Sequence, residues 1–281
     1  MFPTVFGVDF SGAKLAGRNT WLACLEPLRK NSRRFRLNSL DCLEKLCGTA
    51  DRPDALAWLV QHIAASADAL WALDFPFGLP VEVVDPSARW HTQLDLLHAW
   101  GEDAYGLGLE CVRRAQQRGG PMHIRRLTDF EAKSPFDCYH YRIIYQTFYG
   151  MRDVLGPLRL LRRTAILPFH YRRLPSARRV LVEACPTSTL KRLGLPHNNY
   201  KQPEGGPLTR KRLRSRHAII DGLTDHVTMD AKQRRTIMRN GGGDALDAVI
   251  AALGAAQAWR DADHRGIARH PRYPQEGRLY C

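Results

Sequence analysis

Short apolar runs alternate with polar turns along the N-terminal part of the chain. The runs cover residues 5–10, 20–25 and 34–40, and each is bounded by small or polar residues. Runs of this length, separated by turn-like links, are typical of successive strands. We therefore predict an antiparallel meander of three strands at the start of the chain.

A helix and a more deeply buried strand are expected next. Residues 54–67 place Leu56, Leu59, Val60 and Ile63 at helical spacing. The nearly continuous apolar run at 69–74 is typical of a strand that is buried on both faces. Such a strand, reached through a crossover helix, is expected to lie parallel to the first one.

The rest of the chain predicts mostly helices. Residues 85–163 carry helical patterns, the longest at 139–161, and no clear strand. We interpret this stretch as a helical insertion in a single domain that spans residues 1–281. Further expected elements are a strand at 179–184, a short helix at 187–193, a loop at 196–207, a basic helix at 208–223, an alanine-rich helix from 244 to about 259, and a polar tail after 263 with room for one short strand. The expected fold is α/β, with a mixed sheet flanked by helices.

Acidic residues stand where these elements end. They are Asp9, Asp74 and Glu183 at strand ends, and Asp244 and Asp247 in the first turn of the last long helix. The carboxyl ends of neighbouring parallel strands meet at one edge of a sheet, and residues three apart share a helix face. Two carboxylates about 4 Å apart repel by roughly 4 kcal/mol at an effective dielectric of 20, so such a cluster needs a cation. Oxygen ligands suit Mg²⁺ or Mn²⁺, and two such ions can activate water and stabilise the leaving oxygen of a phosphodiester.

Each acid also has a purely structural interpretation. Asp244 could cap its helix, with Asp247 as its partner in a capping box. Asp74 could form a turn before Phe-Pro, and Glu183 could pair with an arginine. Asp9 is harder to explain in this way, because it ends an apolar strand and precedes Ser-Gly.

Four motifs, in this order, resemble the domain of unknown function 429 family. They are VDFSGA at 8–13, LDFPFGLP at 73–80, VEACP at 182–186 and GDALDA at 243–248. The resemblance spans about residues 4–260. That family is regarded as predicted nucleases of the ribonuclease-H-like superfamily, so the resemblance implies a ribonuclease-H-like fold and a metal-dependent hydrolase.

The superfamily pattern has one acid on the first strand, one at the end of the fourth strand, and one or two on the closing helix. The resemblance assigns these catalytic and metal-binding places to Asp9, Asp74, Asp244 and Asp247, with paired helix acids similar to those of RuvC-type resolvases. Two departures stand out. Residue 74 is Asp instead of the commoner, longer Glu, and Glu183 lies outside the usual resolvase set, although we include it among the expected metal ligands.

The charge of the chain favours a nucleic-acid partner. The formal net charge is +14, and arginine supplies most of it. Arginine binds phosphate with a planar fork of donors, so this surface suits a polyanion. The expected substrate-binding residues are Lys14 near the acids and Arg210, Lys211, Arg212 and Arg214 on the basic helix. The alternative for these residues is ordinary solvated charge, and for the tyrosines at 139–149 it is core packing instead of base stacking.

The sequence also argues against other classes of protein. It has no apolar run near the roughly 20 residues that cross a membrane, and its N-terminus lacks a signal-peptide pattern. Seven scattered cysteines without a Cys-x-x-Cys pair argue against a zinc ribbon and a disulfide framework. We therefore expect a cytoplasmic protein that does not associate with membranes.

Three functions remain open from the sequence. The leading one is a metal-dependent nuclease that hydrolyses DNA or RNA. The second is a non-catalytic nucleic-acid-binding module, although an acid cluster would repel phosphate there. The third is an ATP-dependent phosphotransferase of the actin and sugar-kinase type, which usually needs two copies of the domain, whereas these 281 residues show one strand-Asp-turn motif.

Overall fold

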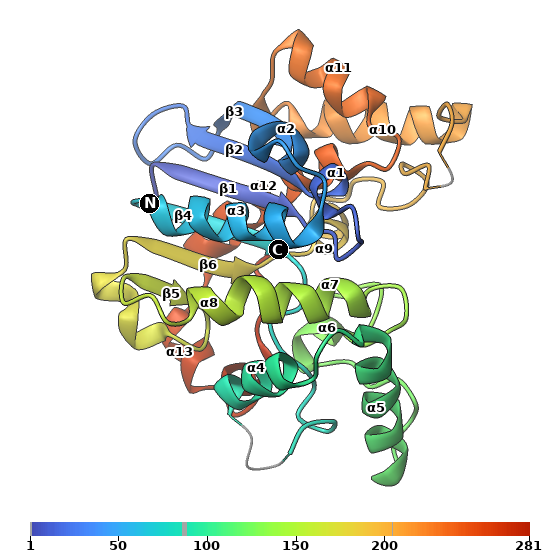
Figure 1. Cartoon of the computed structure of the whole chain (residues 1–281). Coiled ribbons are helices and arrows are strands. Elements are labelled where there is room, and N and C mark those ends of the chain that lie inside the picture. Colours follow the sequence, from blue (N-terminus) through green and yellow to red (C-terminus); the bar gives the residue numbers. More distant parts are fainter. Residues whose placement is uncertain (1, 86–88, 204) are drawn as a thin grey trace.

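A seven-stranded mixed sheet forms the centre of the part that the computed structural model describes, residues 2–85, 89–203 and 205–281 (Figure 1). The strand order is β5-β6-β4-β1-β2-β3-β7. The strands are β1 (Thr4–Asp9), β2 (Trp21–Pro27), β3 (Phe35–Cys42), β4 (Ala69–Asp74), β5 (Thr164–Ile166), β6 (Arg179–Glu183) and β7 (Val227–Thr228). Strands β1 to β3 form the antiparallel meander, and β4, β5 and β6 extend the sheet in parallel from β1. The predicted α/β class and mixed sheet are confirmed, and the arrangement is compatible with a ribonuclease-H-like fold.

Helices cover both faces of the sheet, because strand residues alternate between two apolar cores. One core packs against α3 (Arg52–Ala65), α4 (Trp90–Ala99), α5 (Ala104–Gln117), α7 (Ile144–Tyr149) and the π-helix Gly150–Leu155. The other packs against α9 (Pro186–Arg192), α10 (Arg210–Leu223), α11 (Ala231–Arg239) and α12 (Asp244–Asp261). The shorter helices are α1 (Ala16–Asn19), α2 (Leu43–Cys47), α6 (Leu127–Glu131), α8 (Gly156–Leu158), the 3-10 helix Tyr171–Ser176, α13 (His264–Arg269) and α14 (Tyr273–Glu276).

Helix α12 lies directly on β1. Its residues from Ala245 to Ala256 are all buried, which its small alanine side chains permit. A Cβ built on Gly7 of β1 would lie 2.0 Å from the Ala248 carbonyl oxygen and 2.8 Å from the Ala252 Cβ. Glycine at position 7 thus allows a close approach that fixes the start of α12 beside the end of β1.

The structure departs from the expected elements in several places, including the helices α1, α2 and α11, which were not predicted. Strands β5 and β7 were not predicted, because three and two residues are too short to show a period. The helix expected over 139–161 is broken into α7, a π-helix and α8, and it begins only at Ile144. Residues 140–142 form a local turn instead, in which the His140 ring accepts a hydrogen bond from the Arg142 N–H. The tail forms α13 and α14 before Leu279 makes an isolated bridge with Glu183.

In the described part of the chain, no helix combines the length and the apolar character that crossing a bilayer requires.

Candidate active site

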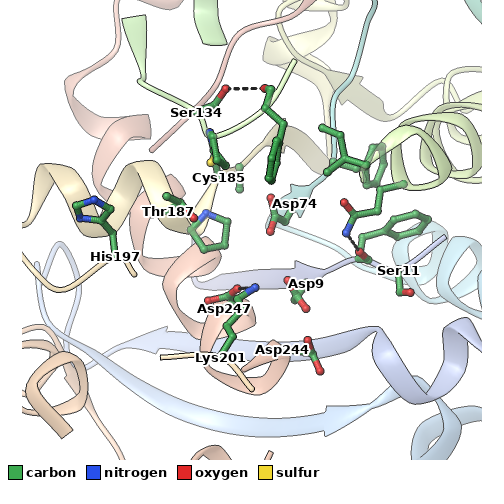
Figure 2. Close-up of a pocket in the computed structure, with 18 of the residues that line it drawn as sticks. Asp9, Ser11, Asp74, Ser134, Cys185, Thr187, His197, Lys201, Asp244 and Asp247 are labelled. Carbon is green, nitrogen blue, oxygen red and sulfur yellow. Dashed lines mark hydrogen bonds and ion pairs between the residues drawn. The ribbon is translucent and has the colours of Figure 1, made fainter. Parts of the chain in front are cut away.

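Asp9 and Asp74 lie side by side at the carboxyl ends of β1 and β4. They are direct partners in the parallel register of these strands. Directly opposed residues of neighbouring strands point to the same face. By alternation this is the face of Val5, Leu70 and Ala72, which belong to the core under α12. Both carboxylates therefore point toward the start of α12 (Figure 2).

The first turn of α12 brings two more aspartates to this place. Its N-cap is Gly243, with φ +90°, which has no side-chain cap. The Asn240 side chain instead accepts the Ala245 N–H, at 3.1 Å. Asp244 is thus the first residue inside the helix, not its cap, and the alternative of a capping box between Asp244 and Asp247 is wrong.

Burial, together with neighbouring carboxylates, raises the pKa of three of the four aspartates. Burial raises the pKa of Asp9 well above its usual value, and Asp247, Asp244 and Asp74 raise it further, against the effect of Lys201. Burial, followed by Asp247, raises the pKa of Asp74 to about 7, and burial also raises that of Asp244. The cluster therefore holds more negative charge than its surroundings compensate.

Lys201 supplies one positive charge to the cluster from the loop at residues 196–207. Its ammonium forms an ion pair with Asp247, whose other oxygen accepts a 2.9 Å hydrogen bond from the Tyr200 hydroxyl. Burial alone would lower the pKa of Lys201, but Asp247, Tyr200 and Asp9 outweigh it and raise the pKa well above its usual value. Sequence reasoning missed both residues, because nothing local separates them from other loop residues.

The donor set suits a hard divalent cation. Four carboxylates around one opening offer only oxygen, which Mg²⁺ and Mn²⁺ prefer. Among the residues that the structure describes, however, no group of three or more His, Cys, Asp or Glu side chains is already arranged as a ligand set. Lys201 accounts for part of this, since its ammonium occupies one oxygen of Asp247.

Glu183 does not join the four aspartates. It pairs with Leu73, one residue before Asp74, so it points to the opposite face of the sheet. There the Arg126 guanidinium binds both of its carboxylate oxygens, and the Phe77 N–H donates to Oε2 at 3.0 Å. The geometry thus favours the alternative of an ion pair with arginine over a metal ligand.

An open cleft of about 810 Å³ lies over the acid cluster. Its lining includes Asp9, Asp74, Asp244, Asp247 and Lys201, as well as the more distant Glu183. Of the five expected substrate-binding residues, Arg212 lines this cleft, and its guanidinium also bonds the Gln202 side chain. Lys14, Arg210, Lys211 and Arg214 are exposed and lie outside the lining.

The basic helix is less exposed than its charge pattern predicts. One of its faces lies in the core, where Arg216 is buried together with Ile219, Ile220 and Leu223. The Arg216 guanidinium donates to backbone carbonyls of Tyr200, Ile237, Asn240 and Gly241. A buried arginine is stable there because these carbonyls replace its water, and it holds the Tyr200–Lys201 segment at the site.

Comparison with known proteins gives a family and no function. Neither a curated protein nor a solved structure matches the chain significantly. Residues 158–275, from β5 through α12 to α14, match the family described as "Protein of unknown function (DUF429)". This stretch contains Lys201, Asp244 and Asp247 of the cluster. This stretch, which is less than half of the chain, is therefore similar to the DUF429 family.

Proposed function

We propose that this protein is a divalent-metal-dependent nuclease that hydrolyses phosphodiester bonds of nucleic acid. One observation carries the proposal. Asp9 and Asp74, adjacent in register, face Asp244 and Asp247 at the floor of an open cleft. Burial, followed by Asp247, raises the pKa of Asp74 to about 7, so a cation bound beside Asp74 would favour its ionised form.

Each residue has a distinct role in this proposal. Asp9 and Asp74 hold Mg²⁺ or Mn²⁺ from the sheet, and Asp244 and Asp247 hold it from the helix. A bound ion of this kind activates water and stabilises the charge of the leaving oxygen. Lys201 binds a non-bridging phosphate oxygen at the cleft floor, and Arg212 binds the neighbouring backbone from the cleft wall.

The cellular setting belongs to the same proposal. All seven cysteines are free, and five of them are buried. Unpaired thiols persist in reducing compartments, so we place the protein in the cytoplasm.

The test is cleavage of labelled single-stranded, duplex and hairpin DNA and RNA with Mg²⁺, with Mn²⁺ and with EDTA. We expect metal-dependent cleavage by the wild type and a loss of at least about 100-fold in Asp9→Asn, since one ligand charge at the reacting centre disappears. Asp261→Asn, at the exposed far end of α12, is the matched control and should cleave normally. Equal cleavage by wild type and Asp9→Asn would end the proposal.

The same protein samples separate the alternatives. Nucleic-acid binding that is unchanged by Mg²⁺ and by Asp74→Asn, without any cleavage, favours the non-catalytic binding module. ATP binding detected by calorimetry, again without cleavage, favours the phosphotransferase.

A further inference from the structure

One wall of the cleft carries the aromatic residue Phe136, with further aromatic side chains next to it in sequence. It is formed by residues 134–146, of which Ser134, Pro135, Phe136, Ile143 and Gln146 line the cleft. Next to them in sequence, Tyr141 is 59% exposed and Tyr145 is 44% exposed. The other tyrosines of this stretch, Tyr139 and Tyr149, are buried in the core. Two tyrosines of this stretch therefore pack in the core, and Tyr141 and Tyr145 remain at the surface.

Four of these side chains form one continuous platform. The His140 ring stacks on Phe136, with centroids 4.7 Å apart and planes at 28°. It also contacts Tyr141, at 4.5 Å and 32°. The Arg142 guanidinium lies 5.7 Å from the centroids of both Phe136 and Tyr141. We call Phe136, His140, Tyr141 and Arg142 the aromatic platform.

Tyr145 is fixed beside the acid cluster. A Cβ on Gly12 would lie 2.2 Å from the Tyr145 carbonyl oxygen, so the two backbones are in direct contact. The Gln146 side chain donates to the Phe10 carbonyl at 2.6 Å. These contacts hold the first turn of α7 against the segment that follows Asp9, and Ser11 of that segment lines the cleft.

The two walls match two parts of one ligand. Lys201 and Arg212 offer positive charge on one side, and α10 continues it with Arg210, Lys211 and Arg214. Residues 134–146 offer ring faces and a guanidinium: Phe136 lies in the cleft lining, and Tyr141, Arg142 and Tyr145 lie close in sequence to the lining residues Ile143 and Gln146. Phosphates need the first surface and unpaired bases the second, since a stacked base pair hides its π-faces inside a duplex.

We propose that the cleft binds single-stranded nucleic acid, with bases stacked on the aromatic platform and Tyr145 and with phosphates along Lys201, Arg212 and α10. This inference rests on the proposed nuclease function and specifies its substrate class. It predicts that the protein acts on single strands, unpaired ends or loops in preference to continuous duplex.

The test measures binding without catalysis. Fluorescence anisotropy in EDTA compares labelled single strands of about 12 nucleotides, oligothymidylate and oligouridylate, with a duplex of the same length. We expect single strands to bind at least about 10-fold more tightly than the duplex. The double variant Tyr141→Ala/Tyr145→Ala should lose about 10-fold or more of its single-strand affinity, as removal of base stacking usually causes.

Two controls separate stacking from general damage. Tyr105→Ala removes a tyrosine that is 49% exposed on α5, a helix that contributes no residue to the cleft lining, and the variant should bind like the wild type. Tyr141→Phe/Tyr145→Phe keeps both ring faces and should restore the affinity that the alanine variant loses. Equal affinity for single strand and duplex, or full affinity in the alanine variant, overturns the inference.

Failure of the inference and failure of the nuclease proposal give different results. Metal-dependent cleavage with a preference for duplex overturns the single-strand assignment and leaves the nuclease intact. Tight single-strand binding that depends on Tyr141 and Tyr145, with no cleavage under any metal condition, supports the binding assignment and removes the nuclease.

Discussion

At the residue scale, Lys201 and the proposed cation would compete for the same oxygen atoms. The ammonium is paired with Asp247 at the floor of the cleft, where a divalent ion would need that carboxylate. The aspartates on β1, β4 and α12 are held by the sheet and its helix, so the Lys201 side chain is the group that would have to move. Lys201 therefore stabilises the acid cluster when no cation is bound and weakens the binding of one.

Lys201→Met tests this competition. We expect the variant to bind Mn²⁺ several-fold more tightly than the wild type in calorimetry, because Asp247 becomes free. We also expect its metal-free form to unfold at a lower temperature, since a buried carboxylate loses its partner. Lys232→Met, at an exposed position of α11, is the charge-matched control and should change neither quantity. Weaker Mn²⁺ binding by Lys201→Met would contradict this account.

Glu183 and Asp74 should differ sharply as metal ligands, although their strands are neighbours. Asp74 faces the cluster, whereas Glu183 is bound by Arg126 on the other face of the sheet. We expect Asp74→Asn to lower Mn²⁺ affinity at least about 10-fold and Glu183→Gln to change it less than about 3-fold. Glutamine keeps an acceptor for the Phe77 N–H, and Arg126 keeps its pair with Asp129, so part of this buried network remains. A 10-fold loss in Glu183→Gln would restore Glu183 to the ligand set.

At the element scale, the contact between β1 and α12 assembles the site. A side chain at position 7 has no space, because its Cβ would meet the Ala248 carbonyl at 2.0 Å. We expect Gly7→Ala to lower the free energy of unfolding by at least about 2 kcal/mol in urea denaturation, as overpacking does, and to weaken Mn²⁺ binding. Gly156→Ala is the control: its Cβ lies 3.6 Å from the nearest atom, so stability should hold or rise. Normal Mn²⁺ binding by Gly7→Ala would show that the close contact between β1 and α12 is not needed to form the site.

His170, in the turn after β5, should make the free energy of unfolding fall at acid pH. Burial, followed by Arg173 and His91, lowers the pKa of His170 to about 3. In the unfolded chain a histidine has a pKa near 6.5, so below that pH unfolding takes up a proton. The free energy of unfolding therefore falls by up to about 1.4 kcal/mol for each pH unit below 6.5. His170→Gln removes this proton uptake and should flatten the fall in urea stability between pH 6.5 and 4. The exposed His98→Gln should leave the slope unchanged, and an unaltered slope in His170→Gln would refute the assignment.

The sequence predicts elements better than it predicts their contacts. Periodicity placed β1 to β4, β6 and α12 within two residues of their observed bounds, because each is long and strongly patterned. It also placed four aspartates at element ends, and topology brings these together. It could not decide that Glu183 faces away, because a shift of one residue in register reverses the face. Lys201 and Tyr200 were missed because Arg216 holds their loop through long-range contacts.

At the scale of the whole molecule, the positive charge is distributed unevenly. Residues 209–240, which include α10 and α11, hold nine arginines and lysines against three aspartates, and so carry six of the net +14. These helices adjoin the loop that carries Lys201 (Figure 1). The acid cluster by itself repels phosphate, so a polyanion needs this flanking charge to enter the cleft.

The salt dependence of binding measures how much of that charge touches the strand. For single strands, each phosphate contact adds about 0.7 to the slope of log affinity against log salt, so Arg210→Ala/Lys211→Ala/Arg214→Ala should reduce the slope by about 2. The control Arg29→Ala/Lys30→Ala/Arg33→Ala removes the same charge from the β2–β3 turn, at the opposite end of the sheet from Asp9. If only net charge determined binding, both variants would show the same reduction of the slope. If α10 contacts the phosphates, as we propose, the control keeps the wild-type slope.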